Sequence, residues 1–161
     1  MLGKLLSREE CAKCRLCCCF DSYDLWETPV INRETHDRIL GEFKPDQEFL
    51  ELEDHYLLKM EKEPDRDLYY CSLLDHEKGC LMGTEKPFDC RIWPFRVMKL
   101  DGRRVIVLST VCPVVQTRPL CEIQALAKEL APEIFAYADE NPFAVKKYME
   151  GYPIMVVEEG R

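Results

Sequence analysis

The sequence lacks long hydrophobic runs, internal repeats and low-complexity segments. A helix that spans a bilayer needs about 20 consecutive apolar residues, and no run approaches that length. The first ten residues carry charges too early to provide the apolar stretch of a signal peptide. We therefore expect a cytoplasmic protein with no membrane partner.

Positive charge is also scarce. The chain has 22 Lys and Arg residues against 30 Asp and Glu residues, a net charge of −8. Nucleic acids and anionic membranes attract basic surfaces, so no nucleic-acid partner is expected. The 161 residues, 47% of them hydrophobic, are enough for a folded domain with its own core. We expect a single domain over residues 1–161.

The common catalytic signatures are missing as well. The sequence contains no phosphate-binding loop, no pairing of a nucleophile with a base and no S-adenosylmethionine motif. The C-x3-C-x2-C spacing of radical enzymes that use S-adenosylmethionine does not occur in the N-terminal loop. The sequence therefore names no substrate and leaves open whether the protein is an enzyme.

Cysteine, in contrast, is abundant: the chain has ten, and five of them lie in the stretch Cys11–Cys19. Cys11, Cys14 and Cys17 are separated from one another by two residues each, which lets three thiols turn toward one point. Metal and iron–sulfur sites take several ligands from a short loop in this way.

Adjacent residues rarely face the same centre, so Cys17 and Cys18 are expected to diverge. Cys18 or Cys19 is expected to point to a second site, a bridging role or the core. Disulfides are the rival interpretation. Disulfide scaffolds are typically short and secreted, whereas clustered thiols in a reducing cytosol more often hold metal.

The later thiols are isolated along the chain. Cys71 lies in a predicted strand, where it is either a ligand or a core residue, and the turn Asp75–Gly79 returns the chain to Cys80. Cys90 lies between Pro87 and Pro94, which stiffen the backbone of a ligand loop.

Cys112 follows a predicted hairpin of residues 95–100 and 103–108 about the turn Asp101-Gly102. Antiparallel pairing returns Cys112 to the side of Cys90. We predict that both sulfurs lie within roughly 8 Å of the N-terminal thiols, the reach of one multinuclear site or two adjacent sites. Cys121 is expected to be a core thiol outside the site.

The spacing favours iron–sulfur over zinc. A structural zinc site usually pairs two close-spaced cysteine knuckles, and only the first is present here. The C-x2-C-x2-C run and the dipeptide Cys112-Pro113 match parts of a bacterial iron–sulfur pattern. The expected cofactor is an iron–sulfur cluster, [4Fe–4S], with zinc as the alternative.

The remaining patterns predict an α+β fold, with a small antiparallel sheet and metal-ligand loops packed with C-terminal helices. Asn32 is expected to cap a helix that Gly41 stops. A helix over residues 117–137 is expected to kink or restart at Pro132, with Leu120 at the start of its apolar face. Residues 152–157 are expected to form an edge strand or tail.

The cysteine pattern resembles that of the CxxCxxCC cysteine-cluster family, also called the YkgJ family. The resemblance covers about two-thirds of the chain, up to Cys112, and is carried by Cys11-x-x-Cys14-x-x-Cys17-Cys18, Cys71, Gly79-Cys80 and Lys86-Pro87-x-x-Cys90-Arg91-x-x-Pro94-Phe95. Lys86 stands where the family usually has Arg, and Cys19 is extra. Members are described as zinc- or iron-chelating proteins, and flagellin lysine methylases carry a similar cysteine cluster. The resemblance implies a metal-ligand set of Cys11, Cys14, Cys17, Cys18, Cys71, Cys80 and Cys90, with Cys112 as a frequent eighth thiol.

These observations lead to three hypotheses of function. The first is an iron–sulfur protein for electron transfer, or for a maturation or protein-modification role, with Arg91 tuning the charge of the cluster by hydrogen bonding to sulfur. The second is a structural zinc-binding interaction protein. The third is a redox enzyme or a component of protein lysine methylation. The expected partners are metal ions and a protein partner or protein substrate.

Overall fold

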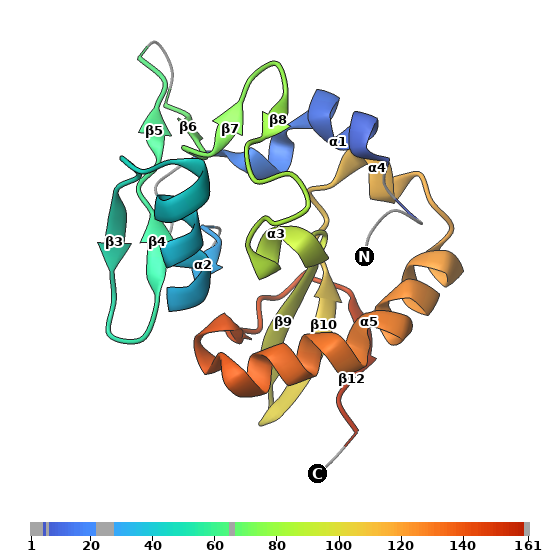
Figure 1. The fold of residues 1–161 in the computed structure, drawn as a ribbon. Coiled ribbons are helices and arrows are strands. Elements are labelled where there is room, and N and C mark those ends of the chain that lie inside the picture. The colour runs from blue at the N-terminus through green and yellow to red at the C-terminus, as the bar shows by residue number, and fades with distance from the viewer. Residues whose placement is uncertain (1–4, 6, 22–27, 65–66, 160–161) are drawn as a thin grey trace. The chain divides into compact units, whose positions relative to one another are not determined.

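The computed structural model describes residues 5, 7–21, 28–64 and 67–159. It has the α+β fold expected from the sequence, with several small sheets and a long C-terminal helix (Figure 1). The chain packs as two compact units, which we call the thiol unit, residues 8–91, and the sheet unit, residues 1–7 with 92–161. The single domain expected over residues 1–161 stays a prediction.

The thiol unit consists of short elements joined by turns. Its helices are α1 (Arg8–Cys14), the 3-10 helix η2 (Leu16–Cys18), α2 (Arg33–Arg38), the π-helix η3 (Ile39–Phe43) and α3 (Phe88–Ile92), whose last residue belongs to the sheet unit. Its strands are β1 (Cys19–Phe20), β2 (Val30–Ile31), β3 (Phe49–Glu51), β4 (Tyr56–Leu58), β5 (Glu61–Lys62), β6 (Tyr69–Tyr70), β7 (Leu74–Asp75) and β8 (Gly79–Cys80). They form three small sheets, with the orders β1-β6-β5, β2-β4-β3 and β7-β8.

Helix α2 begins where the sequence predicts. The side chain of Asn32 accepts a hydrogen bond of 2.9 Å from the backbone N–H of Thr35, as an N-cap residue does. The predicted stop at Gly41 is wrong, because η3 carries the chain on as far as Phe43. The Lys44 N–H closes this last turn with a bond of 2.8 Å to the Ile39 carbonyl.

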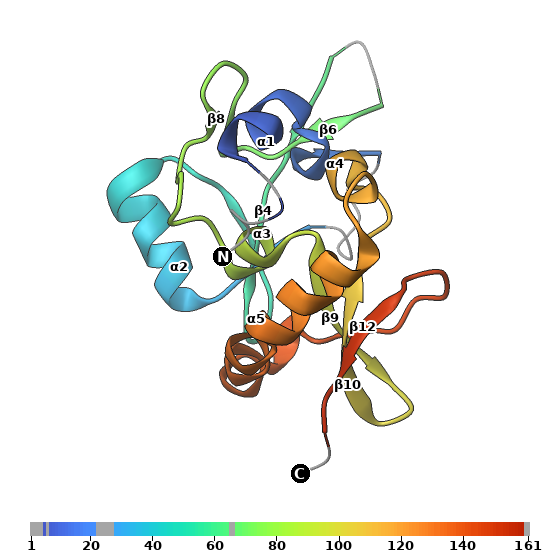
Figure 2. The same cartoon turned by 90° about the vertical axis from the view of Figure 1, so that its right-hand side faces the viewer.

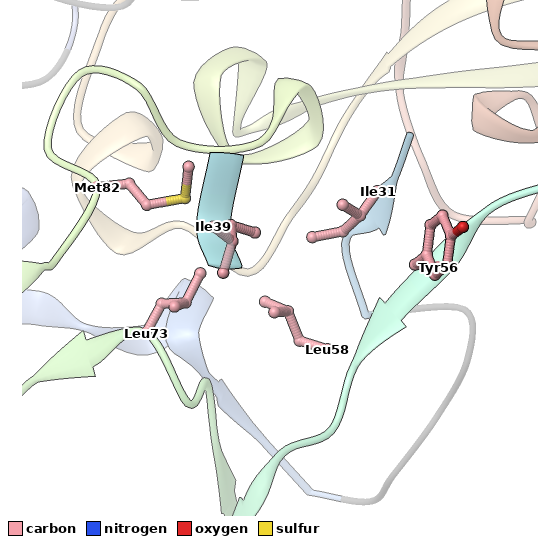
Figure 3. Close-up of a cluster of buried hydrophobic side chains, with 6 residues drawn as sticks. All are labelled: Ile31, Ile39, Tyr56, Leu58, Leu73 and Met82. Carbon is pink, nitrogen blue, oxygen red and sulfur yellow. The ribbon is translucent and has the colours of Figure 1, made fainter. Parts of the chain in front are cut away.

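The thiol unit has a compact apolar core (Figure 3). Two of the ten cysteines, Cys71 and Cys80, are partly buried and pack against this core. The core side chains come from β2, α2/η3, β4 and the loops beside β7 and β8; they are Ile31, Ile39, Tyr56, Leu58, Leu73 and Met82. Burial of apolar surface therefore fixes the backbone from which these two thiols project.

The sheet unit contains the four-stranded sheet and the long helix. Its elements are β9 (Phe95–Leu100), β10 (Arg103–Leu108), α4 (Pro113–Gln116), α5 (Leu120–Glu140), the 3-10 helix η4 (Pro142–Ala144), β11 (Lys146–Lys147) and β12 (Ile154–Val157). The strand order is β11-β9-β10-β12, so β12 is an edge strand, as predicted. Figures 1 and 2 show α5 running beside β9, β10 and β12.

The β9–β10 hairpin confirms the predicted register. Leu100 pairs with Arg103, and the turn residues Asp101 and Gly102 have φ values of 48° and 81°. Two central residues with positive φ are the signature of a type I′ turn, which matches the twist of the flanking strands.

Helix α5 contains Pro132 within one continuous element, so it does not restart there. Leu130 and Ile134 on either side of the proline are both buried, and packing offsets the lost hydrogen bond. The helix differs from its prediction at Cys121. Cys121 is exposed rather than in the core, and Leu120 is 62% exposed. The buried face of α5 therefore begins only at Ile123. Within the described ranges, no helix is long and apolar enough to cross a membrane.

Candidate metal centre

The N-terminal thiols are placed by a helix and a sharp turn. Cys11 lies within α1 and Cys14 ends it, three residues apart and so on neighbouring positions of the helix surface. Arg15 follows with φ 53° and ψ 2°, the left-handed conformation, and its N–H donates to the Cys11 carbonyl across 3.1 Å. A left-handed residue in this position ends a helix and changes the direction of the chain. The turn at Arg15 delivers Cys17 and Cys18 on the 3-10 helix η2.

Cys17 and Cys18 face the same region, although they are adjacent in sequence. Their Sγ atoms are 4.0 Å apart, so the prediction that these two thiols diverge is wrong. A tight 3-10 turn brings successive side chains closer in direction than an extended chain does. The chain becomes extended only at Cys19, with φ −125° and ψ 133°.

Cys19 is the thiol that points away. Burial and the charges of Asp21 and Glu63 raise its pKa, while a hydrogen bond with the Tyr70 side chain opposes that rise. None of these neighbours is a thiol. The difference coincides with the change from the 3-10 helix η2, which ends at Cys18, to the extended strand β1, which begins at Cys19. The expectation that Cys18 or Cys19 faces elsewhere is thus met by Cys19.

Cys71 is joined to this turn through the backbone. Its N–H donates to the Cys18 carbonyl across 2.9 Å, one residue beyond the β1–β6 pair of Cys19 and Tyr70. The carbonyl of Cys71 then accepts from the Leu74 N–H at 2.9 Å. The β1–β6 ladder therefore determines which side chain of the second segment meets the N-terminal thiols.

Cys80 is brought back by the predicted turn between β7 and β8. Leu74 pairs with Cys80 across the hairpin, and Gly79 has a φ of 87°. The Asp75 carboxylate accepts from the backbone N–H groups of Glu77 at 2.9 Å and Lys78 at 2.8 Å. An aspartate that binds the backbone two and three residues on is a turn-forming residue, so the turn is built by Asp75 and Gly79.

Cys90 comes from the first turn of α3. Its N–H donates to the Pro87 carbonyl across 2.9 Å. The preceding residue, Asp89, is buried and accepts a bond of 3.1 Å from the backbone N–H of Val30. This bond ties α3 to the β2 strand and holds Cys90 in place.

Five thiols of this unit lie close enough to influence one another's pKa values. The hydrogen bond with Cys17, burial and the charges of Cys17, Cys71 and Cys90 raise the pKa of Cys18. Burial, opposed by a hydrogen bond from the Leu73 backbone, raises the pKa of Cys71 to about 12, and Cys80 and Cys17 add to the rise. For Cys90, burial and then Cys71, Cys80 and Cys17 raise the pKa well above its ordinary value. The set Cys17, Cys18, Cys71, Cys80 and Cys90 therefore lies within one electrostatic neighbourhood.

This donor set suits a soft metal. Thiolates crowded in a low-dielectric site repel one another, and a bound cation reverses that balance and deprotonates its thiol ligands outright. All-sulfur ligation selects zinc, copper(I) or iron–sulfur clusters. Among the residues described, no three Cys, His, Asp or Glu side chains stand ready-arranged around a single ion. A metal held by these thiols would therefore require their side chains to rotate.

A pocket of about 80 Å³ opens at these thiols, and we call it the thiol pocket. Sequence reasoning missed its cationic residues, because Arg15, Lys78 and Lys86 come from three segments with no common motif. The helix α1 and the strand β8 that border it lie side by side in both views (Figures 1 and 2). The lining residues are Cys11, Arg15, Cys17, Cys18, Leu74, Lys78, Gly79, Cys80, Gly83 and Lys86.

The other predicted site residues occupy different settings. Cys14 is exposed at the end of α1. Cys112 is buried in the sheet unit directly before α4, and its place in the metal site stays a prediction. The guanidinium of Arg91 lies 5.5 Å from the ring centre of Phe88. Its Nε is buried and has no hydrogen-bond partner among the described residues, so this donor is oriented by the fold without a protein acceptor.

The comparisons with known proteins leave this site to be interpreted from its own residues. No family model, curated protein or solved structure matches the chain.

Proposed function

We propose that this protein binds metal through its thiol unit and carries an iron–sulfur cluster, [4Fe–4S], for electron transfer or for a maturation or protein-modification role. The observation that carries the proposal is the convergence of Cys17, Cys18, Cys71, Cys80 and Cys90 from η2, the β6–β7 connection, β8 and α3. If no cation is bound here, these crowded thiols must stay protonated, because their pKa values are raised.

The number of thiols supports a cluster over a single zinc ion. One tetrahedral zinc takes four ligands, whereas five thiols interact here and Cys11 lines the adjoining pocket. The unpartnered Nε of Arg91 adds a buried donor, and hydrogen bonds to cluster sulfurs are one of the ways in which proteins set the reduction potential. Cys11 and Cys14 of α1 complete the ligands proposed from the thiol unit, and Cys112 stays a predicted further ligand.

A structural zinc site is the second candidate. The strands of the thiol unit are only two or three residues long, and Cys71 and Cys80 pack against its core. A zinc ion between them would hold small sheets together and leave function to a protein partner. A redox enzyme or a component of protein lysine methylation is a separate, third candidate. The resemblance to the YkgJ family and a cytoplasmic location, where clustered thiols stay reduced, are also part of what we propose.

Anaerobic purification followed by metal analysis, absorption and electron paramagnetic resonance spectroscopy tests the proposal. We expect iron and sulfide in the wild-type protein and a marked loss of both in Cys17→Ser. Cys121→Ser is the matched control, because Cys121 is an exposed thiol of the sheet unit. Full metal content in Cys17→Ser would overturn the assignment of this site, and zinc without iron would decide for the second candidate.

A further inference from the structure

The thiol pocket carries a charge opposite to that of the chain. The protein has a net charge of −8, yet Arg15, Lys78 and Lys86 all line this one pocket. No Asp or Glu is among its lining residues in the described part of the chain. The pocket is therefore a local region of positive potential on an acidic protein.

Two acidic side chains close in sequence to the lysines of the pocket, Asp75 and Glu85, have partners of their own. Asp75 accepts from the backbone of its own turn, and the N–H groups of Lys78 and Glu77 lower its pKa, with a smaller effect from the Lys78 charge. Glu85 pairs with Arg38 across 2.6 Å. Neither carboxylate lines the pocket, so the wall that carries Lys78 and Lys86 includes no acidic side chain among the described residues.

The shape of the pocket leaves room beside the sulfurs. Its volume of about 80 Å³ exceeds the roughly 15 Å³ that a single water molecule requires. Gly79 and Gly83, with φ values of 87° and 56°, contribute backbone without side chains to its wall. A small molecule can thus approach the thiols Cys11, Cys17, Cys18 and Cys80, which share this pocket.

We propose that the thiol pocket binds small carboxylate-bearing anions beside its sulfurs, with Arg15, Lys78 and Lys86 holding the carboxylate. The guanidinium of Arg15 matches a carboxylate with two parallel donors, and the lysines act as point charges. This function goes beyond metal binding, and it does not depend on a metal being present.

Two alkylating reagents of nearly equal size, iodoacetate and iodoacetamide, test the proposal. They differ in charge, and both react in the same way: the thiolate sulfur attacks the methylene carbon, the carbon–iodine bond breaks, iodide leaves and the thiol proton passes to the buffer. Peptide mass spectrometry on the reduced, metal-free full chain gives the rate at each cysteine. The ratio of the two rates isolates the effect of reagent charge, because both reagents need the thiolate.

Exposed Cys121 of the sheet unit is the internal reference. We expect the iodoacetate-to-iodoacetamide ratio to be about tenfold higher at Cys11, Cys17, Cys18 and Cys80 than at Cys121, since a charged cleft concentrates ions of opposite sign. About 0.5 M salt should remove most of that difference by screening. Equal iodoacetate-to-iodoacetamide ratios at the pocket thiols and at Cys121 in the wild-type protein would already overturn the proposal.

The double variant Lys78→Gln, Lys86→Gln should bring the pocket ratio close to that of Cys121. The matched control is Lys128→Gln, Lys147→Gln, which removes the same charge from exposed positions of the sheet unit and should leave the ratio unchanged. An equal fall in both variants would mean that net charge, and not the pocket, governs the rates, which overturns the proposal. A chain that shows the expected ratios but takes up neither iron nor zinc would refute the metal function alone.

Discussion

The backbone N–H of Cys71 donates to the carbonyl oxygen of Cys18 across 2.9 Å, and this bond extends the β1–β6 ladder by one residue. The bond places the backbone of Cys71 beside that of Cys18, so the pairing of β1 with β6 brings the second cysteine segment to the N-terminal thiols. The site is therefore specified by strand register as much as by the spacing of cysteines.

A matched pair of variants checks this relationship. Cys18→Ser should lose most of its bound metal, whereas Cys19→Ser should keep it, because only Cys18 lies among the converging thiols. Metal content per chain after anaerobic reconstitution is the measurement. Equal losses in the two variants would contradict the assignment of faces.

Removal of metal should loosen the thiol unit selectively. Its strands are short and thiolate sites contribute ~10 kcal/mol or more to the folding of small metal domains. Hydrogen exchange with and without a chelator should show weaker amide protection in β1, β6 and β8, while the apolar core keeps the unit folded and β9 and β10 of the sheet unit are unchanged. Unaltered exchange throughout, with metal release verified, would show that metal does not stabilise the thiol unit.

The metal-free protein should lose stability at alkaline pH. Burial raises the folded-state pKa of Cys71 from 9.0 to about 12. Above pH 9 the unfolded chain therefore releases this proton while the folded chain keeps it, so the free energy of unfolding falls as pH rises through this window. The fall is about 1.4 kcal/mol per pH unit for each such thiol. Denaturant titrations between pH 8 and about 12 measure it, and Cys71→Val should reduce the slope.

Arg104 should be a main support of the sheet unit. It pairs with Asp139 of α5 at 2.8 Å and with Glu158 after β12, its Nε lying 2.7 Å from the Glu158 carboxylate. The guanidinium also lies 5.5 Å from the ring centre of Phe135. These contacts and the Asp139 and Glu158 carboxylates hold its pKa above the usual value.

Arg104→Ala should lower the free energy of unfolding by about 2 kcal/mol, because the side chain is partly buried and leaves two carboxylates together. Chemical denaturation followed by circular dichroism gives the value. Lys99→Ala, at an exposed position of the neighbouring strand, is the control and should change stability by less than about 0.5 kcal/mol. A similar loss of stability in both variants would show that Arg104 has no special role.

Local signals in the sequence predicted local structure well. The Asp101-Gly102 turn and the alternating residues around it predicted the β9–β10 hairpin, because turn type and strand register are both set within a few residues. The Asn32 cap was recognisable for the same reason. The turn from Asp75 to Gly79 likewise needed only its own residues.

Tertiary contacts decided the features that the sequence predicted wrongly. Gly41 does not end its helix, because η3 continues to Phe43. The approach of Cys71 to Cys18 follows from a strand pairing with a distant segment. Arg15, Lys78 and Lys86 come from three segments, and no one segment signals that they line one pocket.

The Cys18–Cys71 hydrogen bond joins residues that are synthesised at different times. Translation proceeds from the N-terminus at roughly 5–20 residues per second, so the thiols of α1 and η2 leave the ribosome several seconds before Cys71 and Cys80. During that interval they have neither the ladder that orients Cys18 nor the partners that enclose it. The most cysteine-rich stretch of the protein is therefore synthesised before the segments that orient and enclose it.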